Sequence, residues 1–192
     1  LIHVIGDSQA EQFVPMLLEN NSEFDYLITP MLGATFFPNL YYDYKDQSVN
    51  HKTKINTHYI NLISEILDEN YIKYKNRIIL IAGRTGFALN NFNFFNSEIK
   101  SIENDKLKSI VFNNFERLIK KNNINTKFIL IPDIPVPSLT LSECVKNIKN
   151  PINYKNECKF DISKFTNERF SIDNIYKQLF LNNMNVFLFD FK

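Results

Sequence analysis

The sequence predicts a three-layer α/β/α sandwich around a five-stranded, mainly parallel sheet of the flavodoxin-like type. Short apolar runs of strand length alternate with longer segments of helical periodicity along the chain. One of these runs, Arg77 to Ala82, is apolar almost throughout, which is typical of a strand buried on both faces of a parallel sheet. The 192 residues can bury a substantial core, and we expect a single domain over 1–192.

Each expected element follows from local patterning. Helices are expected at 10–20, 55–73, 97–122 and 168–182, and strands at 2–5, 25–29, 77–82, 127–131 and 185–189. Pro15 is expected to bend the first helix, because proline lacks the N–H that a helix interior needs. The apolar stripe of the second helix is Ile55, Tyr59, Leu62, Ile63, Ile66 and Leu67. Residues 33–54 show no clear period and are expected to form a long surface loop.

Charge and hydropathy exclude some functions and leave the location open. The formal net charge of +1 gives no global field that would attract nucleic acid. No apolar run reaches the roughly 20 residues needed to cross a bilayer. The chain begins with Leu1 inside the first expected strand, so we expect a segment of a longer protein, whose targeting signals would lie elsewhere.

The strongest chemical signal is the tetrapeptide Gly6-Asp7-Ser8-Gln9, directly after the first expected strand. A parallel strand would deliver Ser8 to the carboxyl edge of the sheet, where ligands bind in folds of this class. Gly6 would permit a sharp turn, and the next helix would point its amino end at the hydroxyl. This arrangement suits a serine nucleophile, although Ser8 in such a position also suits a simple helix cap.

Beyond this tetrapeptide, an ordered set of segments resembles a known superfamily. Val4 to Ala10 (VIGDSQA) is similar to the first block of the SGNH/GDSL hydrolases. Ile78 to Thr85 (IILIAGRT), Phe128 to Pro137 (FILIPDIPVP) and Asn185 to Asp190 (NVFLFD) resemble later strands of one subgroup. That subgroup comprises the SGNH domains fused to membrane-bound acyltransferase-3 proteins, which O-acetylate bacterial surface polysaccharides. The resemblance spans nearly the whole chain.

The resemblance implies a role for several residues. Ser8 would be the nucleophile and, through its N–H, an oxyanion donor, while Asp7 would brace the catalytic turn. Gly33 is the best candidate for the second-block glycine, whose N–H would also face the oxyanion. Where the third-block asparagine would stand, the chain has Gly83-Arg84-Thr85. Arg84 would then replace the asparagine as a donor or hold an anionic group, and Thr85 replaces the usual tryptophan of the subgroup.

The base of the family is a histidine three residues after an aspartate, in a block beyond the fifth strand. This chain ends at Lys192, so we expect that block to lie outside this segment. His3 is expected to be structural, and neither His51 nor His58 has an acidic residue placed to orient it. Asp133 at the end of the fourth strand is consistent either with a cleft residue or with ordinary turn chemistry.

Cys144 and Cys158 are the only cysteines. Their surroundings are consistent with two free thiols, or with one bridge that would stabilise a loop of about 15 residues by about 3 kcal/mol. The resemblance implies the bridge, because its subgroup tends to carry a cysteine pair here. Two cysteines without a nearby histidine cannot form a structural zinc site.

The resemblance implies a serine enzyme that transfers or hydrolyses an ester-linked acyl group, with acetyl on a carbohydrate as the expected substrate. The implied partners are a carbohydrate acceptor, an acyl-ester donor and a membrane acyltransferase domain, at a periplasmic or other extracytoplasmic site, with no metal or cofactor. The alternatives are a non-catalytic carbohydrate-binding module and a stand-alone secreted esterase. A nucleotide binder is disfavoured, because the turn has one glycine where a phosphate cradle usually needs several. The rings of Phe92, Phe94 and Phe95 suit either a lid or the core.

Overall fold

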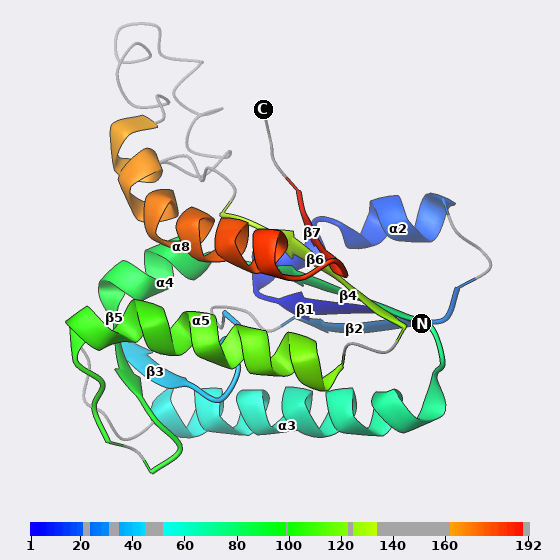
Figure 1. Cartoon of the computed structure of the whole chain (residues 1–192), viewed down its shortest axis with the longest axis horizontal. Helices are drawn as coiled ribbons and strands as arrows, with labels where there is room; N and C mark the ends of the chain where they lie inside the picture. The colour runs from blue at the N-terminus through cyan, green and yellow to red at the C-terminus, as the bar shows by residue number, and fades with distance from the viewer. Residues whose placement is uncertain are drawn as a thin grey trace, which may run out of the picture.

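A computed structural model describes residues 1–20, 24–30, 35–44, 52–98, 100–122, 125–133 and 162–189. The chain forms an α/β sandwich around a five-stranded, all-parallel sheet, as predicted (Figure 1). Its strands are β1 (Ile2–Gly6), β2 (Tyr26–Pro30), β4 (Arg77–Ala82), β6 (Thr126–Ile131) and β7 (Val186–Leu188). The described helices are α1 (Ser8–Glu11), α2 (Val14–Asn20), α3 (Lys52–Lys73), α4 (Thr85–Asn91), α5 (Asn104–Lys121) and α8 (Ile162–Asn182).

The strand order is β2-β1-β4-β6-β7, which is the flavodoxin-like order when these five strands are counted alone. The chain adds β2 on one side of β1 and then crosses to the other side to add β4. The topological switch point therefore lies between the carboxyl ends of β1 and β4. Ligands of doubly wound sheets bind at such a point.

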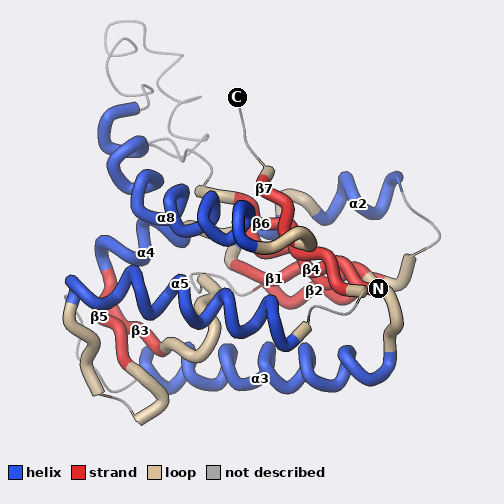
Figure 2. The backbone as a smooth tube through the Cα atoms, in the orientation of Figure 1, coloured by secondary structure: helices blue, strands red, loops and turns tan. Residues whose placement is uncertain are grey.

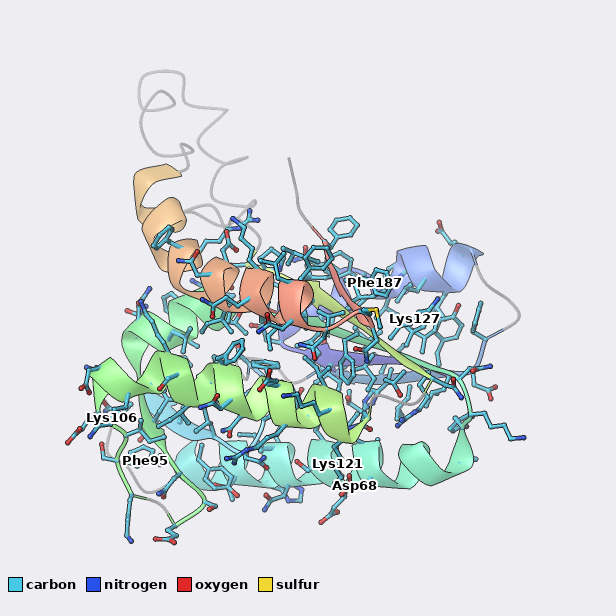
Figure 3. All side chains as sticks on the ribbon, viewed as in Figure 1. Asp68, Phe95, Lys106, Lys121, Lys127 and Phe187 are labelled. Carbon is cyan, nitrogen blue, oxygen red and sulfur yellow. The ribbon has the colours of Figure 1, made fainter. Side chains whose placement is uncertain are left out.

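Two apolar clusters hold the helices on opposite faces of the sheet. On one face, Ile5, Ile79 and Phe128 pack with buried residues of α3, α5 and α8. On the other, Val4 and Leu80 pack with α1 and α2. Figure 2 shows the strands running between these helices. At the surface, Lys121 of α5 forms an ion pair with Asp68 of α3 at 2.5 Å (Figure 3). Because both side chains are exposed, this ion pair contributes little to the free energy of folding.

Several elements differ from the sequence prediction. The helix expected at 10–20 is two helices, α1 and α2, and Pro15 occupies the second position of α2, where its missing N–H costs nothing. The helix expected from 97 begins only at Asn104, and Leu62 of α3 is 41% exposed rather than buried.

The expected loop at 33–54 was wrong in part, because it contains a strand. This strand, β3 (Tyr41–Tyr44), pairs antiparallel with β5 (Phe92–Phe95), and the short helix α4 precedes β5. The rings of Phe92 and Phe94 are buried with Phe37 and Tyr42, so they belong to the core rather than to a lid. Phe95 is half-buried.

Tyr59 of α3 ties the carboxyl ends of two strands together. Its buried hydroxyl lies 2.8 Å from the carbonyl oxygen of Thr29 and 3.0 Å from that of Gly6. It also accepts a hydrogen bond from the Gly6 N–H at 3.3 Å. Burial raises the pKa of this phenol, so it remains a neutral donor at all ordinary pH values.

Replacing Tyr59 by phenylalanine should lower the free energy of unfolding by about 1–3 kcal/mol, because buried backbone groups lose their partner. Urea unfolding measures the change. Tyr41→Phe is the matched control, since the Tyr41 hydroxyl bonds Asn61 in an exposed position. Equal effects of the two substitutions would contradict a special role for Tyr59.

Candidate active site

Gly6 ends β1 in a conformation that requires glycine. Its φ is +149°, in a region that L-residues rarely adopt. A Cβ atom at this position would lie 1.6 Å from the Ala82 carbonyl oxygen on β4. The absence of a side chain therefore lets β1 approach β4 closely just before the chain turns into α1.

Asp7 holds this turn through three hydrogen bonds. Its Oδ1 accepts the Gln9 N–H at 2.8 Å, which makes Asp7 the N-cap of α1. Its Oδ2 accepts the Arg84 N–H at 2.8 Å and the Thr35 hydroxyl at 3.1 Å. Asp7 is only 4% exposed, so its carboxylate bonds groups inside the protein. Through the bond to Arg84 it joins the turn after β1 to the turn after β4.

Ser8 is the first residue of α1 and is half-buried. The helix cap is Asp7, so Ser8 is not needed as a cap. Neither the backbone N–H nor the hydroxyl of Ser8 has a hydrogen-bond partner among the described residues. Both groups lie beside the switch point of the sheet, where ligands of such folds bind.

The turn after β4 brings Arg84 to the same edge. Because its backbone N–H donates to Asp7, Arg84 can offer a ligand only its side chain. The guanidinium stacks on the Phe87 ring, 3.9 Å from the ring centroid, and in the described part of the chain it forms no ion pair. A half-buried guanidinium with unused donors suits an anion or a developing oxyanion.

Asp133 supplies a second buried carboxylate just beyond β6. Its Oδ1 accepts the Thr85 hydroxyl at 3.0 Å and the Gly86 N–H at 2.9 Å, and its Oδ2 accepts the Phe87 N–H at 3.0 Å. Burial raises the pKa of this carboxyl, although the three hydrogen bonds oppose the rise. Asp133 is 3% exposed, so it neither lines an open cleft nor forms an ordinary surface turn.

Neither described histidine contacts Ser8 through a hydrogen bond. His3 is 1% exposed, and its Nε2 lies 2.8 Å from the Thr29 hydroxyl. The Thr29 hydroxyl donates to the Val4 carbonyl, so Nε2 carries the proton and Nδ1 is a buried acceptor without a partner in the described structure. His58 is exposed on α3, and His51 lies outside the described residues.

Burial lowers the pKa of His3 to about 4 from 6.5. Below pH 6.5 the unfolded chain binds a proton that folded His3 refuses, so stability should fall from pH 6.5 toward 4, by up to about 3 kcal/mol. His3→Gln should remove this part of the decline. Urea unfolding of the two proteins at several pH values measures the difference. A decline that persists unchanged in His3→Gln would contradict the assignment.

Three predicted site residues lie outside the described residues. They are Gly33, the candidate second oxyanion glycine, and Cys144 and Cys158, the candidate disulfide pair. Their roles stay predictions. In the described part of the chain, no group of three or more His, Cys, Asp or Glu side chains is arranged to hold a metal ion. None of the described helices is long and apolar enough to cross a membrane.

A cavity of about 620 Å³ lies away from this site, at the amino ends of the strands. Its lining includes Leu1, Arg77, Lys127 and the exposed ring of Phe187, which Figure 3 shows beside Lys127. Neither Ser8, Arg84 nor either buried carboxylate lines it. We therefore place the candidate site at the carboxyl edge, where a nucleophile and unused donors meet.

Sequence reasoning brought Ser8, Asp7 and Arg84 together correctly at one edge of the sheet, but it missed the contribution of Thr35 and the full involvement of Asp133. A signal for Asp133 was present, since the carboxyl ends of neighbouring parallel strands meet at one edge. Comparisons with protein-family models, curated proteins and solved structures find no match to the chain. The functional interpretation therefore depends on the residues of this chain.

Proposed function

We propose that this domain is an SGNH-type serine enzyme that transfers or hydrolyses an acyl ester, with acetyl on a cell-surface carbohydrate as the substrate class. The observation that supports the proposal most is the position of Ser8 and the state of its polar groups. Its hydroxyl and its N–H both lack a partner in the described structure, at a helix amino end and at the switch point of a parallel sheet. Because Asp7 caps α1, neither group of Ser8 is needed for the cap, and both can serve a ligand at this edge.

The proposed reaction has two halves. In the first, the Ser8 Oγ attacks the acyl carbonyl, a base takes its proton, and the ester bond breaks to release the donor alcohol, which receives that proton. In the second, the base takes the proton of a sugar hydroxyl or water, whose oxygen attacks the acyl carbonyl. The bond between the acyl group and Oγ then breaks, Oγ receives the proton, and the acylated sugar or the free acid leaves. Neither described histidine bonds Ser8, so we assign the base to a histidine outside the described residues, as the resemblance implies.

The oxyanion needs donors at the point where negative charge develops. The Ser8 N–H and the Arg84 guanidinium are unused donors at this edge, and the N–H of Gly33 is the third proposed donor. Each preorganised donor of this kind is worth about 3–4 kcal/mol of barrier. The same resemblance suggests an extracytoplasmic location and a fused or associated membrane acyltransferase domain.

Ser8→Ala in the natural full-length protein should lower ester turnover by at least about 10³-fold, because the proposed acyl intermediate forms on the Ser8 Oγ. Hydrolysis of p-nitrophenyl acetate measures this. Ser109→Ala is the matched control, since the Ser109 hydroxyl is exposed and donates to the Lys106 carbonyl. Unchanged turnover in Ser8→Ala would favour the alternative, a carbohydrate-binding module that retains the fold without the chemistry.

A further inference from the structure

We propose that Asp133 is a positioning residue of this site, which fixes the Arg84 guanidinium by holding the turn from Gly83 to Phe87. The inference rests on the proposed function and adds to it a residue just beyond β6, which lies two strands away from β1 and the nucleophile. Asp133 does not touch the substrate, because it is buried and both of its carboxylate oxygens accept hydrogen bonds from the protein.

Two carboxylates hold this turn from opposite sides. Asp7, which follows β1, accepts the Arg84 N–H, and Asp133, which follows β6, accepts the N–H groups of Gly86 and Phe87. Strand β4, from which the turn emerges, lies between β1 and β6 in the sheet. The turn is thus fixed to both neighbouring strands, and one of these fixed points is the residue directly before Ser8.

The link from Asp133 to the guanidinium passes through Phe87. Asp133 fixes the Phe87 backbone at 3.0 Å, and the Phe87 ring supports Arg84 at 3.9 Å. A shift of Phe87 would remove the surface on which the guanidinium stacks. The Arg84 backbone would stay anchored to Asp7, so its side chain alone would lose its direction.

The chemistry of the contact explains why a carboxylate is used. Three donors converge on Asp133, namely the Thr85 hydroxyl and two backbone N–H groups at the start of α4. An amide would have to turn an NH₂ group toward one of these N–H groups. Tyr176 of α8 is fully buried and lies near Thr85 and Asp133. Burying a carboxylate is costly, so a residue needed only for packing would be apolar.

A double-mutant cycle in the natural full-length protein tests the proposal. The variants are Asp133→Asn, Arg84→Gln and the double variant, and the readout is kcat and KM for p-nitrophenyl acetate, beside urea unfolding of each. Asp133→Asn should lower kcat by about 10-fold with little change in KM, because the oxyanion donor is misplaced. In the Arg84→Gln background the same change should cost less than about 2-fold.

The matched control is Asp68→Asn, which removes a surface carboxylate on α3 and should leave kcat unchanged. If Asp133→Asn does not fold, Thr85→Val replaces it, since this change removes one donor to Asp133 and leaves both backbone bonds. It should lower kcat by about 3-fold, again only when Arg84 is present. An equal loss in both backgrounds, or full activity of Arg84→Gln, would overturn the proposal. Failure of the proposed function itself would appear separately, as full activity of Ser8→Ala.

Discussion

Replacing Gly6 by alanine is expected to destabilise the fold by more than about 4 kcal/mol. The new Cβ would lie 1.6 Å from the Ala82 carbonyl oxygen, and a φ of +149° is itself unfavourable for alanine. The clash cannot be relieved by a side-chain rotation, because the obstructing atom belongs to the backbone of β4. Strands β1 and β4 would have to separate at the centre of the sheet. Urea unfolding of the variant measures the loss.

Gly83→Ala is the matched control for this change. Its Cβ would lie 3.2 Å from the Asp7 carboxylate, a tight contact that small shifts can relieve. We expect a loss of about 1 kcal/mol or less, together with slower turnover at Ser8 because Asp7 is displaced. A Gly6→Ala variant as stable as Gly83→Ala would show that β1 and β4 do not approach each other as described.

Replacing Asp7 by alanine should lower the free energy of unfolding by about 3–5 kcal/mol. Three donors, the N–H groups of Gln9 and Arg84 and the Thr35 hydroxyl, would lose their shared acceptor inside the protein. The turn that presents Ser8 would lose its connection to β4. Ser8 should therefore react poorly even at temperatures where the variant stays folded.

Asp7→Asn separates the two effects of that change. The amide keeps one oxygen for the Gln9 N–H, and its NH₂ group can donate to the Thr35 hydroxyl, but it cannot accept from Arg84. The free energy of unfolding should fall by about 2 kcal/mol, less than in Asp7→Ala. The reactivity of Ser8 should still fall by a large part of the loss expected in Asp7→Ala. Thermal unfolding and ester turnover, measured on the same samples, test this. Full reactivity in Asp7→Asn would contradict the role of the Asp7–Arg84 bond.

The central sheet could be predicted because its strands are signalled locally. Ile78–Ile81 is a run of large apolar residues, and the structure has the expected strand, Arg77–Ala82. The β3–β5 pair could not be predicted in this way, because Tyr41–Tyr44 and its partner Phe92–Phe95 lie some fifty positions apart. Aromatic residues favour strands, yet short strands of this kind depend on their tertiary partners.

The site shows the same division. Ser8 and Arg84 each follow a parallel strand, and this alone predicts that they lie at one edge of the sheet. The glycine before Asp7 predicts the sharp turn after β1. The convergence of three donors on Asp133 depends on where the start of α4 meets the residues after β6, which no local pattern encodes. No described residue bonds the Ser8 hydroxyl, so the proposal of a histidine base depends on the sequence resemblance alone.

The reactivity of Ser8 in the natural full-length protein tests the account most directly. The protein would be treated with a fluorophosphonate, its intact mass measured, and the modified residue located by peptide mapping. We predict one covalent adduct, on Ser8, that forms in the native protein and is absent after unfolding in urea. An unmodified Ser8 in a folded protein, or an adduct confined to another serine, would contradict the assignment of Ser8 as the nucleophile.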